Sequence, residues 1–91
     1  MKVKYTSSFR KGLKLAAKRG LDIDALSAVV NKLKAGEILP ERYRDHKLNG
    51  KYKGMRECHI APDWLLIYKI DNENVILTLV ATGTHADLLN M

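Results

Sequence analysis

Two apolar runs joined by a short polar turn constrain the fold of this chain more than any other feature. The runs cover residues 65–68 and 75–77, and the turn between them reads Asp-Asn-Glu-Asn at 71–74. Short continuous apolar runs bounded by turn residues are typical of strands that are covered on both faces. The sequence therefore predicts two central strands, over 64–70 and 75–81, in a sheet that packs against other elements.

The first 36 residues predict a strand followed by a helical hairpin. Lys alternates with apolar residues at the start of the chain, which indicates a short edge strand with one buried face. A basic amphipathic helix follows, beginning near Phe9 after a Thr-Ser-Ser cap and ending at Gly20. A second helix, capped by Asp22 or Asp24, carries an apolar stripe and ends at Gly36.

The middle of the chain predicts a loop and then the outer strands of the sheet. Residues 37–47 contain Pro40 and lack a clear period, so we expect a loop there. Strands over 47–51 and 55–60 follow, and a tight turn at 61–63 leads into the first central strand. The element order predicts an α+β fold, in which a short N-terminal strand and a helical hairpin precede an antiparallel β-meander, with the helices packed on one face.

The length of the chain limits its organisation. Because 91 residues supply one core, we expect a single domain over 1–91 with a shallow site. No apolar run reaches membrane-spanning length, and the start of the chain lacks the pattern of a signal peptide. Cys58 is the only cysteine, so the chain has no internal disulfide, which fits a reducing compartment. We therefore expect a cytoplasmic protein.

Positive charge is concentrated in the first two thirds of the chain. Residues 1–60 hold fifteen Lys and Arg against six Asp and Glu, whereas residues 61–91 hold one against four. A basic surface of this kind attracts polyanions and gives salt-dependent affinity for RNA or DNA phosphates. It suits an acidic protein partner equally well, and basic side chains also simply solvate helix faces.

The three histidines all lie in the second half of the chain and are the candidate chemical groups. Imidazole titrates nearest to neutrality, so His46, His59 and His85 beside a carboxylate can supply an acid, a base and charge stabilisation. A tight turn brings Asp63 close to His59, and an antiparallel final strand ends at the same sheet edge, which brings His85 there. Whether His46 reaches this place is left open by the residues alone.

Other readings of these residues remain open. Neighbouring strand residues point to opposite faces, so Cys58 and His59 cannot form a dyad with each other. A zinc site made of His46, His59, His85 and Asp63 is chemically possible, but these residues lack the short paired spacing of metal motifs. Each member also has a structural explanation, since strand histidines and turn carboxylates often only satisfy local hydrogen bonds.

The absence of other motifs narrows the chemistry. Gly50 and Gly54 are isolated rather than part of a phosphate-binding loop, and no nucleophilic serine motif occurs. A basic surface with several histidines suits metal-free cleavage of RNA. There the ribose 2′-OH attacks its own phosphate, one group takes the proton and another protonates the leaving 5′-oxygen. Trp64 adds a candidate stacking surface for a base.

The order and spacing of these motifs resemble a known family. The segments that carry the likeness are Asp45-His46-Lys47-Leu48-Asn49-Gly50, Tyr52-Lys53-Gly54, Arg56-Glu57-Cys58-His59, Pro62-Asp63-Trp64 and Thr82-Gly83-Thr84-His85. They resemble the YafQ family of bacterial toxins, within the RelE/ParE superfamily, over essentially the whole chain. The resemblance implies a RelE-like fold and an endoribonuclease that cleaves mRNA in the ribosomal A site. It also implies neutralisation by a cognate antitoxin, contact with operator DNA only through that antitoxin, and no cofactor.

The resemblance also implies roles for individual residues. The family's active-site positions fall on His46, His59, Asp63, Trp64 and His85. We expect His85 to act as the general acid and Asp63 as the general base. His46 and His59 are expected to bind or stabilise the scissile phosphate, and Trp64 to contact RNA.

Two departures from the family pattern bear on these roles. The family often has an arginine where this chain has Ala81, and an aromatic residue where it has Leu89. We therefore expect phosphate stabilisation and RNA contacts from Arg56, Lys51 or Lys53 instead. The alternative function is a non-catalytic basic module that binds nucleic acid or protein, with histidines that serve only the structure.

Overall fold

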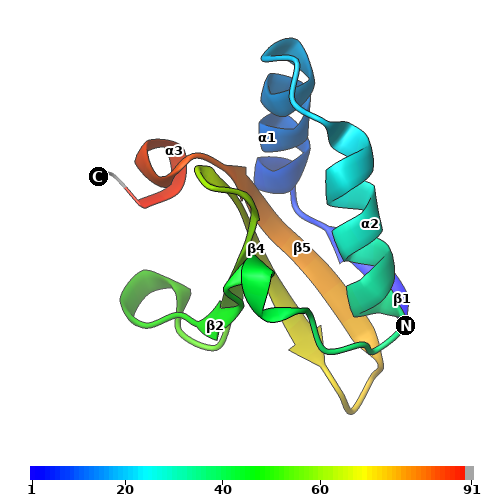
Figure 1. The fold of residues 1–91 in the computed structure, drawn as a ribbon. Coiled ribbons are helices and arrows are strands. Elements are labelled where there is room, and N and C mark those ends of the chain that lie inside the picture. Colours follow the sequence, from blue (N-terminus) through cyan, green and yellow to red (C-terminus); the bar gives the residue numbers. More distant parts are fainter. Residues whose placement is uncertain (90–91) are drawn as a thin grey trace.

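The computed structural model describes residues 1–89, and it consists of one five-stranded sheet with the two long helices on one face (Figure 1). The strands lie in the order β1-β5-β4-β3-β2. In chain order the elements are β1 (Lys2–Tyr5), α1 (Ser7–Lys18), α2 (Ile23–Lys34), the 3₁₀ turn η1 (Glu41–Tyr43), β2 (His46–Lys47), the 3₁₀ turn η2 (Gly50–Tyr52), β3 (Arg56–Ala61), β4 (Trp64–Asp71), β5 (Ile76–Gly83) and α3 (His85–Leu89). None of the described helices is long and apolar enough to cross a membrane.

The sheet confirms the predicted α+β fold. Strands β2 to β5 form an antiparallel meander, and the two strands with apolar runs, β4 and β5, occupy its middle. The N-terminal strand β1 lies at the edge, as predicted, and pairs parallel to β5. A parallel pair needs a crossover connection, which here is made by the two helices and the rest of the meander.

Both long helices begin and end where the sequence predicts. The Thr6 side chain accepts a hydrogen bond from the Phe9 amide, and the Asp22 side chain accepts one from the Ala25 amide, so both are N-caps. Gly20 and Gly36 follow the last helical turns with φ values of 75° and 78°. Because this left-handed backbone favours glycine, each helix stops at that point.

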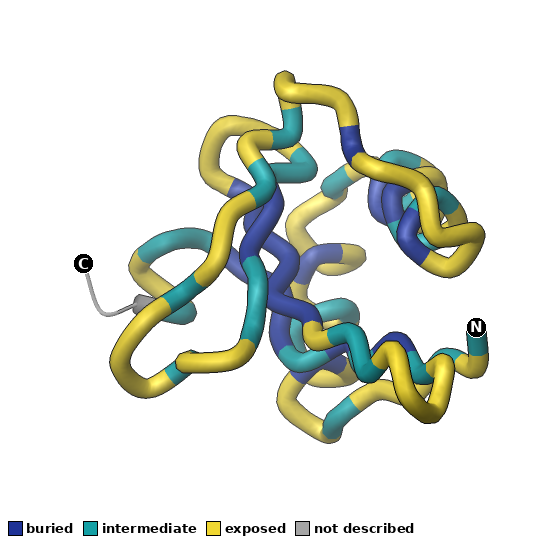
Figure 2. Tube along the Cα trace, turned by 90° about the horizontal axis from the view of Figure 1, so that it is seen from below, coloured by how far each residue is buried: buried dark blue, intermediate teal, exposed yellow. Residues whose placement is uncertain are grey.

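The main core lies between the two helices and one face of the sheet. Its helical members are Phe9, Ala16, Leu26, Val29 and Leu33, and its strand members are Cys58, Trp64, Leu66, Tyr68, Leu77 and Leu79. In Figure 2 the buried stretches, in dark blue, follow the central strands and the inner sides of the helices. Helix α1 approaches β5 so closely that a Cβ on Gly12 would lie 2.2 Å from the Thr82 carbonyl oxygen. Only glycine therefore fits at this contact.

The opposite face of the sheet, which we call the site face, is also largely buried. It carries two rows of paired residues across β3, β4 and β5. The rows are His59–Leu65–Gly83 and Glu57–Ile67–Ala81. Because Leu65 and Ile67 are as fully buried as the residues of the main core, the central strand shows no alternation of apolar and polar residues.

The connections differ from the prediction in three places. The strand expected over 47–51 is only the two-residue β2, and η2 follows it, because Gly50 adopts a left-handed φ of 63° that ends the extended backbone. The loop expected over 37–47 contains the short turn η1. The short helix α3 was not predicted, since five residues are too few to show a helical period.

Candidate functional site

The three histidines come from three different elements and meet on the site face. His46 lies on β2, His59 on β3 and His85 at the start of α3. The ring centroids of His46 and His59 are 6.5 Å apart, and those of His59 and His85 are 5.5 Å apart. His46 pairs with Glu57, two residues before His59 on the same face, which settles the position that the sequence left open.

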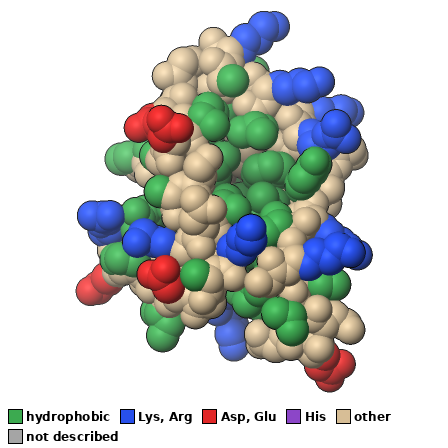
Figure 3. Space-filling model, turned by 90° about the vertical axis from the view of Figure 1, so that its right-hand side faces the viewer, with side chains coloured by type: hydrophobic (Ala, Val, Ile, Leu, Met, Phe, Trp, Pro, Cys, Tyr) green, Lys and Arg blue, Asp and Glu red, His purple; other side chains and the backbone are tan. Residues whose placement is uncertain are grey.

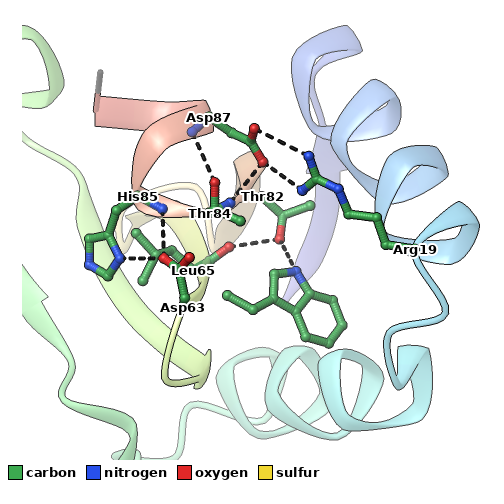
Figure 4. Close-up of polar contacts among 8 residues, drawn as sticks. Arg19, Asp63, Leu65, Thr82, Thr84, His85 and Asp87 are labelled. Carbon is green, nitrogen blue, oxygen red and sulfur yellow. Dashed lines mark hydrogen bonds and ion pairs between the residues drawn. The ribbon is translucent and has the colours of Figure 1, made fainter. Parts of the chain in front are cut away.

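His85 is held by Asp63, which lies in the turn between β3 and β4. The Oδ1 atom of Asp63 accepts a hydrogen bond from the His85 amide at 3.0 Å and lies 2.7 Å from the His85 Nδ1 (Figure 4). The amide hydrogen bond, followed by that of the imidazole, lowers the pKa of Asp63. The carboxylate is thus ionised at neutral pH and keeps a proton on Nδ1, which leaves Nε2 of His85 available for a substrate.

A second network fixes the start of helix α3 (Figure 4). The Thr84 hydroxyl accepts a hydrogen bond from the Asp87 amide at 3.0 Å, and Asp87 Oδ2 accepts one from the Thr84 amide at 2.9 Å. This reciprocal arrangement is a capping box. Arg19, at the end of α1, donates to Asp87 at 2.8 Å, and this bond together with the Thr84 amide lowers the pKa of Asp87 to about 2. The backbone that carries His85 is therefore tied to α1.

His46 contacts a buried carboxylate that the predicted site did not include. Its Nε2 lies 2.9 Å from Oε2 of Glu57, and its Nδ1 lies 2.9 Å from the Arg44 carbonyl oxygen. The Glu57 side chain is only 5% exposed, and its Oε1 has no hydrogen-bond partner among residues 1–89. Strand alternation already placed Glu57 on the same face as His59, and this signal was sufficient to include it.

The structure corrects the role predicted for Trp64. The indole is 3% exposed, and its Nε1 donates a hydrogen bond to the Thr82 hydroxyl at 2.9 Å. That hydroxyl in turn donates to the Leu65 carbonyl at 2.7 Å. Because Trp64 shares the helix-covered face with Leu66, it is part of the core and offers no surface for stacking on a base.

The basic residues predicted to contact RNA separate into two groups. Arg56 lies on the helix-covered side of β3, and its Nε donates to Asp45 Oδ1 at 2.8 Å. It therefore points away from the histidines, and its predicted role at the phosphate is corrected. Lys51 and Lys53 are exposed on and after η2, so both remain available for RNA. The side chain of Leu89 lies outside the described part of the chain.

Cys58 is isolated from the histidines, as its strand position predicts. Its side chain is fully buried on the face opposite His59. Burial raises the pKa of the Cys58 thiol to about 12. Because only the thiolate is an effective nucleophile, the geometry gives this cysteine no part in the chemistry.

The residues of the alternative metal site already make contacts with other protein groups. Among residues 1–89, no three His, Cys, Asp or Glu side chains converge closely enough to hold a metal ion. Both ring nitrogens of His46 face oxygen atoms of the protein, and Nδ1 of His85 faces Asp63.

Known proteins with the same sequence pattern and fold are bacterial toxins. The family model described as a bacterial toxin of type II toxin-antitoxin systems, YafQ, matches residues 1–90. The mRNA interferase toxin YafQ of Escherichia coli strain K12 is 40% identical over 87 residues, which cover 94% of this chain and 92% of that protein.

Solved structures agree with this match. In the crystal structure of the E. coli DinJ-YafQ toxin-antitoxin complex, one chain is 40% identical, with a TM-score of 0.86 and coverage of 94% of this chain and 93% of that one. A metal-bound toxin from Helicobacter pylori is 39% identical, with a TM-score of 0.90 and coverage of 97% and 98%. The chain belongs to the YafQ family of bacterial toxins of type II toxin-antitoxin systems.

Proposed function

We propose that this chain is a ribosome-dependent endoribonuclease that cleaves mRNA without a metal ion and is neutralised by a cognate antitoxin. The observation that carries the proposal is the convergence of three histidines and the Asp63 carboxylate at one edge of the site face. The E. coli relative is named an mRNA interferase, and this name supports the same class of reaction for this chain. In this reaction the ribose 2′-OH of the substrate is the nucleophile, so the protein needs to supply only proton transfer and charge stabilisation.

In the proposed mechanism His85 is the general acid. The Asp63 carboxylate accepts a hydrogen bond from Nδ1 and orients the ring, so that Nε2 can serve as the atom that donates a proton to the leaving 5′-oxygen. Asp63 was predicted to be the base, but its lowered pKa makes it a weak proton acceptor, and its hydrogen bonds suit an orienting role. We therefore assign it to positioning His85.

His59 is the proposed general base. It lies between the other two rings and, within the described chain, no protein hydrogen bond engages its ring. It is partly exposed, so the substrate 2′-OH can approach it. His46, whose two nitrogens both face acceptors, is the proposed contact that stabilises charge on the phosphate. Proton transfer of this kind contributes about 10²- to 10⁴-fold to the rate for each group.

An apolar groove on the far side of the molecule supports the antitoxin partner. The side that carries α2 and β1 gathers hydrophobic side chains along its middle, with Lys and Arg around them (Figure 3). The groove residues include Val3, Tyr5, Phe9, Leu13, Ile23 and Val30. An amphipathic segment with acidic residues complements such a surface, and the antitoxin in the DinJ-YafQ complex is the precedent for a protein partner.

The test is cleavage by the wild type and by the triple variant His46→Ala, His59→Ala and His85→Ala. Each is expressed in cells and, after purification, added to ribosomes carrying a defined mRNA, and the 5′ ends are mapped. Codon-phased cuts made only by the wild type support the proposal. Lys69→Ala, which changes an exposed residue of β4, is the control and should cut normally.

Two further outcomes separate the alternatives. Growth arrest by both the wild type and the triple variant, without cuts, supports the non-catalytic binding module. In the second outcome, EDTA is added and excess Mg²⁺ is then added back, so that the ribosomes stay intact. If cutting is lost under these conditions and only a transition metal restores it, the metal-free mechanism is contradicted.

A further inference from the structure

An open cleft adjoins the histidine cluster on the side of η1. It has a volume of about 470 Å³ and is lined by Arg42, Tyr43, Arg44, His59, Ile60, Ala61 and Pro62. We call it the η1 cleft. His59 forms part of its wall, so any group bound in the cleft lies beside the ring proposed as the base. Its volume falls within the range of small-molecule and nucleotide sites.

The η1 cleft combines positive charge with a flat surface. The Arg42 guanidinium carbon lies 4.8 Å from the centre of the Tyr43 ring, and its Nη2 donates a hydrogen bond to the Tyr43 hydroxyl at 2.9 Å. Guanidinium and aromatic planes in this arrangement are surfaces on which single-stranded bases stack. Arg42 and Arg44 are both exposed, and within residues 1–89 neither makes an ion pair, so both charges are free to meet phosphate.

The backbone of Arg44 connects the η1 cleft to the histidines. Arg44 has a left-handed φ of 48°, a conformation that costs free energy for a residue with a side chain. In this conformation its carbonyl oxygen lies 2.9 Å from Nδ1 of His46. Arg44 therefore lines the η1 cleft and also contacts His46 through its carbonyl, which ties the position of this cleft residue to that of the histidine.

We propose that the η1 cleft binds the RNA nucleotide that flanks the scissile phosphate. Arg42 and Arg44 contact its phosphate, and the Arg42–Tyr43 pair stacks against its base. This assignment rests on the proposed nuclease function, because it takes the histidine cluster as the point of cleavage. It gives the protein the base-stacking surface that the buried Trp64 does not provide.

Binding is tested first with a short single-stranded RNA in a His85→Ala background, which keeps the RNA intact. Fluorescence anisotropy is measured for the added changes Arg42→Ala, Tyr43→Ala, Tyr43→Phe and Arg44→Ala over a range of salt concentrations. Each arginine change should lower the salt slope by about 0.7, the value for one lost phosphate contact on a single strand. Tyr43→Ala should weaken binding about 5- to 100-fold, whereas Tyr43→Phe, which keeps the ring, should bind nearly as the parent does.

Lys69→Ala is the matched control for charge, because it removes one exposed cation from a strand end outside the η1 cleft. It should change affinity less than about twofold, since an isolated surface lysine contributes little to a specific site. Equal losses for Lys69→Ala and the two arginine variants overturn the proposal, because they indicate only a general charge effect.

Cleavage on ribosomes is tested second, with His85 restored. Arg44→Ala should raise KM about tenfold with little change in kcat, and Tyr43→Ala should alter the bases found next to the cuts. If all the cleft variants show the wild-type KM and the wild-type cut sites, the proposed role of the η1 cleft is overturned, while the nuclease proposal still stands. If the wild type does not cut but the cleft variants still lose RNA affinity, the nuclease proposal fails and the RNA site stands. If the cleft variants instead lose antitoxin binding while their RNA affinity is unchanged, the cleft is a contact site for a protein, and the proposal is overturned.

Discussion

His46 lies between two hydrogen-bond acceptors, with Glu57 Oε2 2.9 Å from its Nε2 and the Arg44 carbonyl 2.9 Å from its Nδ1. A carbonyl only accepts, and an ionised carboxylate only accepts. Both contacts are therefore hydrogen bonds only when the ring carries a proton on each nitrogen. Glu57 and the Arg44 carbonyl thus fix the orientation of the His46 ring, which suits a positioning role and does not suit proton abstraction.

Glu57→Gln tests this relationship with almost no change in shape. The Gln side chain can still contact Nε2, so His46 keeps its position but loses its carboxylate partner. Because hydrogen bonds to an ionised group are about twice as strong as neutral ones, we expect cleavage to fall roughly tenfold. In ¹⁵N NMR, the chemical shifts of the His46 ring nitrogens should differ between the wild type and the variant, because the partner of Nε2 has changed. Glu41→Gln, at an exposed position, is the control; identical ring spectra for wild type and Glu57→Gln contradict the assignment.

Asp63→Asn should impair chemistry without destabilising the fold. Asp63 is 65% exposed in its side chain, so little packing is lost, but the variant lacks the carboxylate that accepts a hydrogen bond from Nδ1 of His85. We expect kcat to fall about 10²-fold, at the lower limit for a general acid, with KM nearly unchanged. The measurement is the pH profile of kcat together with the urea midpoint. A large shift of the urea midpoint with normal kcat contradicts the orienting role.

The Asp87 carboxylate should make stability depend on acid pH. Its pKa is lowered to about 2 in the folded chain, from an ordinary value of 3.8. The group therefore stabilises the fold fully above about pH 4, and this contribution is lost as the pH falls toward 2. Because the pair with Arg19 is solvent-exposed, its size should be below about 1 kcal/mol. Urea unfolding between pH 5 and 2 should show a steeper loss for the wild type than for Asp87→Asn; parallel curves contradict the prediction.

Trp64→Phe should lower stability rather than change base selection. The variant loses ring volume and leaves the Thr82 hydroxyl without its donor. We expect a loss of about 2 to 3 kcal/mol in the free energy of unfolding, from the cavity and the lost hydrogen bond. Urea unfolding measures this, and mapped cut sites should match the wild type at a temperature where the variant is folded. If the variant cuts at altered sites while its stability is unchanged, this prediction is contradicted and a stacking role for Trp64 is supported.

Cys58→Ala should cleave RNA at the wild-type rate. The thiol is fully buried and its pKa is raised to about 12, so it is neither exposed nor ionised at neutral pH. The loss of its volume from the core should cost about 1 to 2 kcal/mol. In the folded wild type, a thiol reagent should react slowly, and the rate should rise on denaturation. Rapid modification that stops cleavage contradicts the structural role of Cys58.

The fold followed closely from local sequence signals. Helix ends were predictable because Asp22 and Gly36 act within one turn of backbone. The central strands were predictable because apolar runs as short as 65–68 fit only a covered strand. Helix α3 was missed although Thr84 and Asp87 form a local capping box, because five residues show no helical period and the contact with Arg19 is distant in sequence.

The site was less predictable because its details depend on which face each side chain occupies. Convergence of the histidines followed from strand pairing, but Trp64 was assigned to the wrong environment. Trp64 and Leu66 are two residues apart in β4 and so share the helix-covered face. The sequence does not reveal this face, because the intervening Leu65 and Ile67 are apolar and equally buried. Arg56 was misplaced although the alternation of β3, which separates it from His59, was visible in the sequence.

The parallel pairing of β1 with β5 has a consequence for synthesis. Residues 2–5 are made first, but they can join the sheet only after residues 76–79 have left the ribosome. Pairing over such a long separation in sequence is slow, since the entropic cost of closing a large loop comes before the contacts that stabilise the pair. His85 follows directly after β5, so the nascent chain gains its edge strand and its proposed acid at the same moment. A nascent chain that still lacks β5 therefore has neither a paired edge strand nor the proposed acid.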